Sequence, residues 1–141
     1  MVVVALAIIA GVVLPQVSSA IDDAKQSSLL GHLHELTNAI QRYRIEHDGM
    51  PPDLVTNKDL PQLTGKTDGD GDPGAGSGFI YGPYVLQGMP VNPLNNSRSV
   101  FRVNSSPPTG LQNRVGWVYH PDTGQIWAGL YRGTVDESAG Q

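Results

Sequence analysis

Residues 1–16 read MVVVALAIIAGVVLPQ, and this stretch decides how the rest of the chain is organised. Met1–Leu14 contains no charged side chain and no strongly polar one. As a helix it reaches about 21 Å at 1.5 Å per residue, whereas a hydrocarbon core of about 30 Å needs roughly 20 apolar residues. The segment is therefore the core of a signal peptide, a buried helix, or the later part of a membrane helix.

An amphipathic helix is predicted to follow directly. Residues 16–47 contain no proline and a single glycine, Gly31. Apolar side chains recur mostly every three or four residues, so they form one stripe along a helix. We expect one helix from about Val2 to about His47, bent near Pro15 and stopped by Gly49 and the prolines that follow. The stripe expected to face a sheet consists of Leu29, Leu33, Leu36, Ile40 and Tyr43.

The second half of the chain is rich in glycine and proline and reads as turns and short strands. Residues 49–78 are predicted as a loop region with a helical turn around Asn57–Leu60. Strands are predicted at Phe79–Leu86, Ser99–Val103, Gly116–His120 and Gln125–Tyr131. The turn PDTG at 121–124 places Gly124 in a left-handed conformation. The expected fold is α+β: a helix over 1–48, a small antiparallel sheet over 79–131 and a loose tail over 132–141.

The helical pattern bears on the three interpretations of the opening segment. The sequence VSSA at 17–20 has small residues where a signal peptidase could cut, but no positive region precedes the apolar stretch. The helical pattern also continues through that point. A buried helix is disfavoured because the segment is apolar on all sides and little chain remains to cover it. We expect the later part of a membrane helix, with about six or seven further apolar residues upstream.

This apolar helix, running through Pro15 into an amphipathic one, resembles the N-terminus of type IV pilins and of type II secretion pseudopilins. In that family a leader ending in glycine is cut before a phenylalanine, and a glutamate lies five residues into the mature chain; the present sequence is expected to begin after both. The stretches YGPYVLQGMPVNPLNN (81–96) and GWVYHPDTGQIWAG (116–129) resemble the globular domain of the major, G-type pseudopilins.

The resemblance implies a pilin-like fold and a structural subunit, not an enzyme. It implies a single-pass protein of the inner membrane whose globular domain lies outside the cytoplasm, and a periplasmic or cell-surface fibre after assembly. The implied partners are identical and related pseudopilin subunits, the inner-membrane secretion machinery, and membrane lipid through residues 1–14. The implied task is protein export by a type II secretion system, with N-terminal methylation as in the family. A type IV pilus pilin is the near alternative.

A binding module is the more distant alternative. It would be secreted with a cleaved signal peptide and would present a carbohydrate platform of exposed aromatic side chains, namely Trp117, Trp127, Tyr81 and Tyr84. Aromatic residues at such spacings more often belong to a core. The two interpretations therefore differ in the exposure of these rings.

Composition excludes several other classes of function. The net charge is −4 and the basic residues are scattered, so no nucleic-acid partner is expected. The chain has no cysteine, which removes disulfides, thiol catalysis and cysteine-bound metals. We find no nucleophile elbow, phosphate loop or convincing pair of catalytic carboxylates, and no catalytic or cofactor-binding residue is predicted.

A calcium site is predicted in the acidic stretch TDGDGDPGAGSG at 67–78. Asp68, Asp70 and Asp72 alternate with glycines, as oxygen ligands do where a Ca²⁺ loop begins. The twelfth position of an EF-hand would be Phe79 and not glutamate, so an EF-hand is excluded. The alternative is a solvated acidic turn.

The histidines offer no second metal site. On a helix, His32 and His34 point to different sides, whereas metal-binding helices use pairs four residues apart. These two residues and Glu35 are expected to be surface side chains, and His47 and His120 each stand alone in the sequence.

Overall fold

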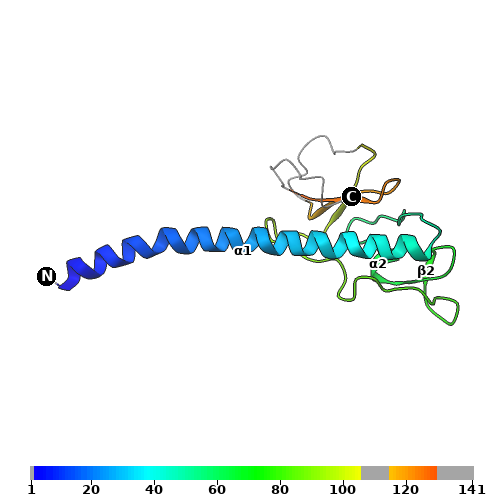
Figure 1. Cartoon of the computed structure of the whole chain (residues 1–141), viewed down its shortest axis with the longest axis horizontal. Coiled ribbons are helices and arrows are strands. Elements are labelled where there is room, and N and C mark those ends of the chain that lie inside the picture. Colours follow the sequence, from blue (N-terminus) through cyan, green and yellow to red (C-terminus); the bar gives the residue numbers. More distant parts are fainter. Residues whose placement is uncertain (1, 106–114, 130–141) are drawn as a thin grey trace.

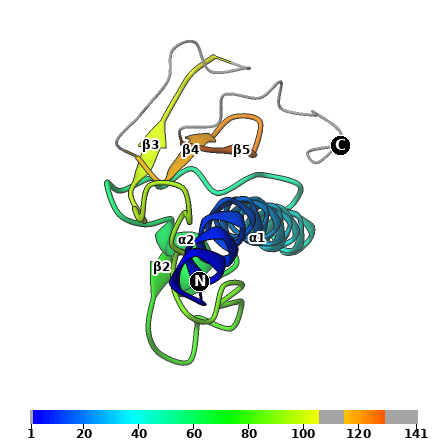
Figure 2. The ribbon, with the colours of Figure 1, turned by 90° about the vertical axis from the view of Figure 1, so that its left-hand side faces the viewer.

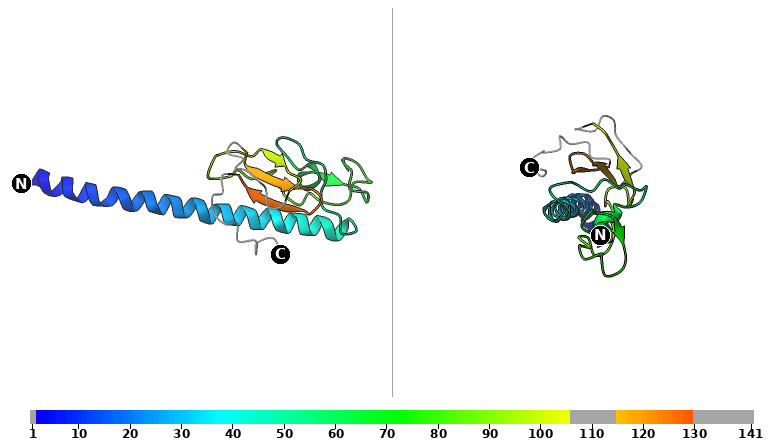
Figure 3. Two further views of the ribbon diagram at one scale, coloured as in Figure 1. Left: turned by 90° about the horizontal axis from the view of Figure 1, so that it is seen from above. Right: turned by 90° about the vertical axis from the view of Figure 1, so that its right-hand side faces the viewer.

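The computed structural model describes residues 2–105 and 115–129 (Figure 1). It is an α+β structure in which helix α1 (Val2–Glu46) carries a small domain along its C-terminal half. The helix continues through Pro15 as one element, as predicted from the sequence. Figure 3 shows that the strands lie alongside the second half of α1 and that the first half extends beyond them.

The end of α1 follows the sequence prediction. Gly49 has φ of 81°, and its amide donates a hydrogen bond of 2.7 Å to the Arg44 carbonyl. A left-handed residue of this kind satisfies carbonyl groups that the last helical turn leaves without partners. Pro51 and Pro52 then carry the chain away from the helix axis.

The main sheet has three strands in the order β3 (Val100–Arg102), β4 (Trp117–His120) and β5 (Gln125–Ala128). β4 and β5 form the predicted antiparallel hairpin, whose turn places Gly124 at φ 74°. β3, however, runs parallel to β4, so the prediction of an antiparallel sheet is wrong for this strand. Two parallel strands need a crossover connection of about a dozen residues or more, and the chain between β3 and β4 is long enough for one.

Two further predictions need correction. Phe79–Leu86 is not a strand: within it only Tyr81 makes a β-bridge, to Thr67. Gly82, at φ 69°, and Pro83 interrupt the extended conformation. The amides of Tyr84 and Val85 then both donate hydrogen bonds to the Leu63 carbonyl. The short helix is α2 (Pro61–Thr64) and not Asn57–Leu60, because Pro61 suits the first helical position.

The stretch 49–78, predicted as loop, also holds two short strands. β1 (Lys66–Thr67) pairs antiparallel with β2 (Pro73–Gly74) and closes the acidic stretch into a hairpin-like loop. Seen along α1, the three-stranded sheet and the α2–β2 segment lie on different sides of the helix (Figure 2). The predicted strand residues after Gly129 and the predicted tail over 132–141 lie outside the described residues.

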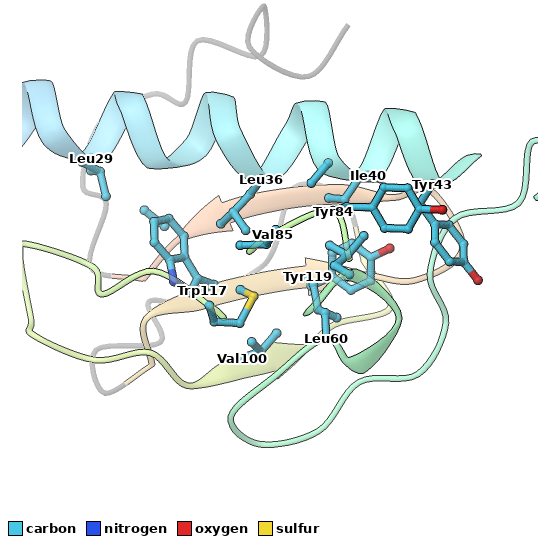
Figure 4. Packing of buried hydrophobic residues seen from close by; sticks show 14 residues of the cluster. Leu29, Leu36, Ile40, Tyr43, Leu60, Tyr84, Val85, Val100, Trp117 and Tyr119 are labelled. Atoms are coloured by element: carbon cyan, nitrogen blue, oxygen red, sulfur yellow. The ribbon is translucent and has the colours of Figure 1, made fainter. Parts of the chain in front are cut away.

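The apolar stripe of α1 forms the core, as predicted. Leu29, Leu36, Ile40 and Tyr43 are buried, and Leu33 is partly buried against the same cluster. The cluster continues into the sheet and the loops through Trp117, Tyr119, Ala128, Leu60, Leu63 and Val85 (Figure 4). The polar ends of the two large rings in β4 are satisfied by backbone carbonyls: the Trp117 indole donates to Pro90 at 2.8 Å, and the Tyr119 hydroxyl donates to Pro52 at 2.7 Å.

Candidate functional site

The first half of α1 projects beyond the domain. Every side chain from Ser18 to Ser28 is exposed, and Leu29 is the first buried residue after them. Residues 2–28 correspond to about 40 Å of helix at 1.5 Å per residue. Isolated helices are marginally stable in water, because most helical stability in proteins comes from packing of one face. A helix with so long a projecting half is therefore expected to pack on a surface outside this chain.

The side of α1 that faces away from the sheet is also open. Leu30 is 52 % exposed and Ile45 is 82 % exposed, although both lie within the part of the helix that carries the domain. A Cβ atom added at Gly31 would meet nothing within 4 Å. The outer face of α1 is therefore accessible along the domain as well as beyond it.

Within the part of the chain that the structure describes, we find no helix with an apolar run of the length needed to cross a bilayer.

The three aspartates of the predicted calcium site lie in one tight turn. The Asp68 carboxylate accepts hydrogen bonds from the amides of Asp70 at 3.1 Å and Asp72 at 3.0 Å, and the Asp68 amide donates to the Asp72 carbonyl at 3.1 Å. The side chains of Asp70 and Asp72 are exposed. Across residues 2–105 and 115–129, no three His, Cys, Asp or Glu side chains are grouped so that they could hold a metal ion. Calcium binding by this loop stays a prediction.

His47, which stands alone in the sequence, is a point of contact between α1 and the acidic loop. It is 3 % exposed, and its Nδ1 lies 2.9 Å from the Tyr43 carbonyl. Its Nε2 lies 3.0 Å from the Asp68 carbonyl and 3.1 Å from the Thr67 hydroxyl. The ring also stacks on Tyr43, with centroids 4.0 Å apart. The only sequence signal for this role was a histidine four residues after an aromatic residue of the buried stripe.

Tyr43 lies where the helix, the acidic loop and α2 meet. Its hydroxyl accepts a hydrogen bond of 3.0 Å from the Gln62 side chain. Burial, followed by the negative charges of Asp53, Asp72 and Asp68, raises the pKa of Tyr43 to about 12. The acidic loop therefore acts electrostatically on the end of α1 as well as contacting it.

The neighbouring Tyr84 ties residues 81–86 to α1. Its hydroxyl donates to the Glu46 carboxylate, and its carbonyl accepts a 2.7 Å hydrogen bond from Arg42. Burial, followed by the bond to Glu46, raises the pKa of Tyr84 well above its usual range. Tyr84 thus has a packing role at the helix.

The other candidate side chains form no site of their own. His32 lies 3.7 Å from Glu35 on the helix surface, and the side chain of Glu35 is exposed, as expected. His120 is buried, and its Nδ1 has no hydrogen-bond partner among the described residues.

The proposed aromatic platform is not present as an exposed surface. Trp117 is 0 % exposed, Tyr84 6 % and Trp127 7 %, while Tyr81 is partly buried against the core. Rings in these positions contribute packing and offer no flat face to a sugar. Their burial counts against the carbohydrate-binding alternative.

Comparisons of the chain with protein-family models, with curated proteins and with solved structures gave no match. The residues of the chain and their geometry therefore carry the functional conclusion.

Proposed function

We propose that this chain is a pilin-like structural subunit, a pseudopilin of a type II secretion system that polymerises through its N-terminal helix. The observation that carries the proposal is the projecting half of α1: its side chains over residues 18–28 are exposed, and the sequence over residues 1–14 is wholly apolar. Apolar burial then drives assembly, because covering such a helix removes its surface from water or places it in lipid.

The division of the molecule into two parts supports this proposal. The small domain buries its own core between α1 and the sheet from Leu29 onward, so it does not need the first half of the helix in order to fold. The first half of the helix is then free to contact other molecules. Before assembly, we place this part in the inner membrane and the domain outside the cytoplasm. In the fibre, the helices lie at the centre and the domains on the outside.

Membrane fractionation tests the proposal. We expect the full chain to sediment with membranes or as large assemblies, and the chain lacking residues 1–20 to be a soluble monomer, because that truncation leaves the core intact. Ile8→Lys places a charge in the apolar segment and should release the full chain, since charges in hydrocarbon are costly. Gln87→Lys adds the same charge at an exposed position of the domain and should have no effect. A full chain that remains monomeric and soluble without detergent would refute the proposal.

Thiol labelling then distinguishes assembly from simple membrane attachment. Because the chain has no cysteine, a single introduced cysteine reports on one position. Ala24→Cys, in the exposed stretch 18–28 of the projecting helix, should become protected from maleimide in the sedimenting fraction, while Gln87→Cys should stay reactive. Equal reactivity of the two positions in that fraction would mean that the helix attaches to membrane without packing against other subunits.

A further inference from the structure

The charged side chains of the domain are unevenly distributed. Residues 46–72 contain seven acidic side chains and two basic ones, whereas residues 79–129 contain three arginines and a single acid, Asp122. The first range holds the acidic loop and the second holds the three-stranded sheet. One region of the domain is therefore negative and another is positive, and such a charge distribution orients an approaching partner.

The negative region lies beside the end of α1. Burial and then the charges of three aspartates raise the pKa of Tyr43, and the three are Asp53, Asp72 and Asp68. The side chains of Asp70 and Asp72 are exposed, and within the described part of the chain neither carboxylate has an ion pair or a hydrogen bond. The acidic loop thus presents negative charge that no described residue neutralises.

The positive region follows β3, which is an edge strand of the three-stranded sheet. Arg98 lies just before β3 and Arg102 ends it, and both side chains are exposed. Among residues 2–105 and 115–129, neither arginine has an ion pair or a hydrogen bond. Phe101, between them, is 41 % exposed. This edge therefore offers apolar contact together with positive charge, which favours an acidic partner.

The two regions do not neutralise each other within one chain. Figure 3 shows β2, which closes the acidic loop, beside the end of α1, and β3 farther back along the helix. The one ion-pair contact among the described residues is His32–Glu35, on the helix. In copies that pack with parallel helices and are displaced along the helix axis, the acidic loop of one copy comes level with β3 of the next.

We propose that the β3 edge, through Arg98 and Arg102, receives the acidic loop of a second copy of this chain. The contact joins two different surfaces, so its repetition produces an open filament and not a closed dimer. The inference rests on the proposed assembly function, because it names the contact that the domains make outside the bundled helices. Exposed ion pairs contribute little to affinity, and their role here is to select which surfaces meet and in which register.

Cysteine pairing tests this contact in the full chain. The chain has no cysteine, so each variant carries a single one. Gly69→Cys lies in the acidic loop, where an added Cβ meets nothing within 4 Å, and Asn104→Cys lies at an exposed position just after β3. The two variants are co-expressed, and the membrane fraction is oxidised with chelator present so that no Ca²⁺ competes for the aspartates. The mixed disulfide should form and the two symmetric disulfides should not, because the contact joins unlike surfaces.

Charge reversal tests the role of the ion pairs. Arg98→Glu combined with Arg102→Glu, in the chain whose cysteine lies beside β3, should lower the yield of mixed disulfide by about fivefold or more, because repulsion replaces attraction. Asp70→Arg combined with Asp72→Arg in the other chain should restore the yield. Asp68 is left unchanged, because its carboxylate accepts the amide hydrogen bonds that hold the turn.

Lys66→Glu is the matched control. It makes the same change of charge as one arginine reversal, at an exposed position beside the acidic loop, and should leave the yield unchanged. For the unaltered charges, raising the salt from about 0.05 M to about 0.5 M should lower the yield, since salt screens exposed charges.

The outcomes separate this inference from the proposed assembly function. A chain that sediments with membranes but forms no mixed disulfide would refute the contact and leave the assembly proposal intact. A yield that the arginine reversals leave unchanged, or that Lys66→Glu lowers equally, would show that these charges do not select the contact and would also refute it. A full chain that stays monomeric without detergent would refute both.

Discussion

Leu36→Ala tests whether the helix stripe is the core of the monomer. Leu36 is 0 % exposed and points from α1 toward Val85 (Figure 4). The substitution removes three carbons, worth about 2.4 kcal/mol at roughly 0.8 kcal/mol for each buried CH₂ group. The cavity left behind adds to this cost, and Leu→Ala changes in rigid cores span about 2–5 kcal/mol. We therefore expect the free energy of unfolding to fall by about 3–4 kcal/mol.

Leu30→Ala provides the matched control, because Leu30 lies on the same helix and is 52 % exposed. Leu30→Ala should lower the free energy of unfolding by less than about 1 kcal/mol, because alanine forms helices better than leucine and little buried surface is lost. Urea unfolding followed by the fluorescence of Trp117 and Trp127, both buried, measures the two variants. Equal costs for the two variants, or a change near zero for Leu36→Ala, would mean that the stripe is not packed in the monomer.

Two further predictions concern the acidic loop and the tyrosine beside it. If the loop binds Ca²⁺, added Ca²⁺ should raise the melting temperature, chelator should reverse the rise and Asp70→Asn should diminish it; identical melting curves would leave a solvated acidic turn. Because the pKa of Tyr43 is raised to about 12, its contribution to stability is complete below pH 10 and declines as the pH rises from 10 toward 12. Tyr43→Phe should lessen that alkaline loss in urea unfolding at pH 9 to 12, and an unchanged slope would contradict the assignment.

The helix and its buried face could be predicted from local pattern alone. The spacing of Leu29, Leu36, Ile40 and Tyr43 is a local property, because residues three and four apart share one side of any α-helix. The positions of Gly49 and Gly124 in turns could be predicted for a similar reason, because a left-handed backbone conformation favours glycine wherever it occurs. The β4–β5 hairpin followed from the PDTG turn between two predicted strands.

The pairing of β3 and the path of residues 79–86 depend on how distant segments meet. Whether a strand pairs parallel or antiparallel depends on the route of the chain between the strands, and no local pattern records that route. Phe79–Leu86 has the composition of a strand, yet its amides at Tyr84 and Val85 bond to a loop carbonyl and not to a neighbouring strand.

The contacts of the acidic loop also could not be predicted from the sequence. His47 and Gln62 are polar residues of ordinary appearance, and their burial becomes visible only when segments about 20 residues apart meet at Tyr43. The sequence left a calcium loop and a solvated acidic turn open for Asp68 and Asp70, and the hydrogen-bond partners of the carboxylates depend on how the segment folds. Sequence periodicity specifies which face of an element is buried; the identity of the groups that satisfy a buried polar atom is set by long-range packing, because those groups come from elsewhere in the chain.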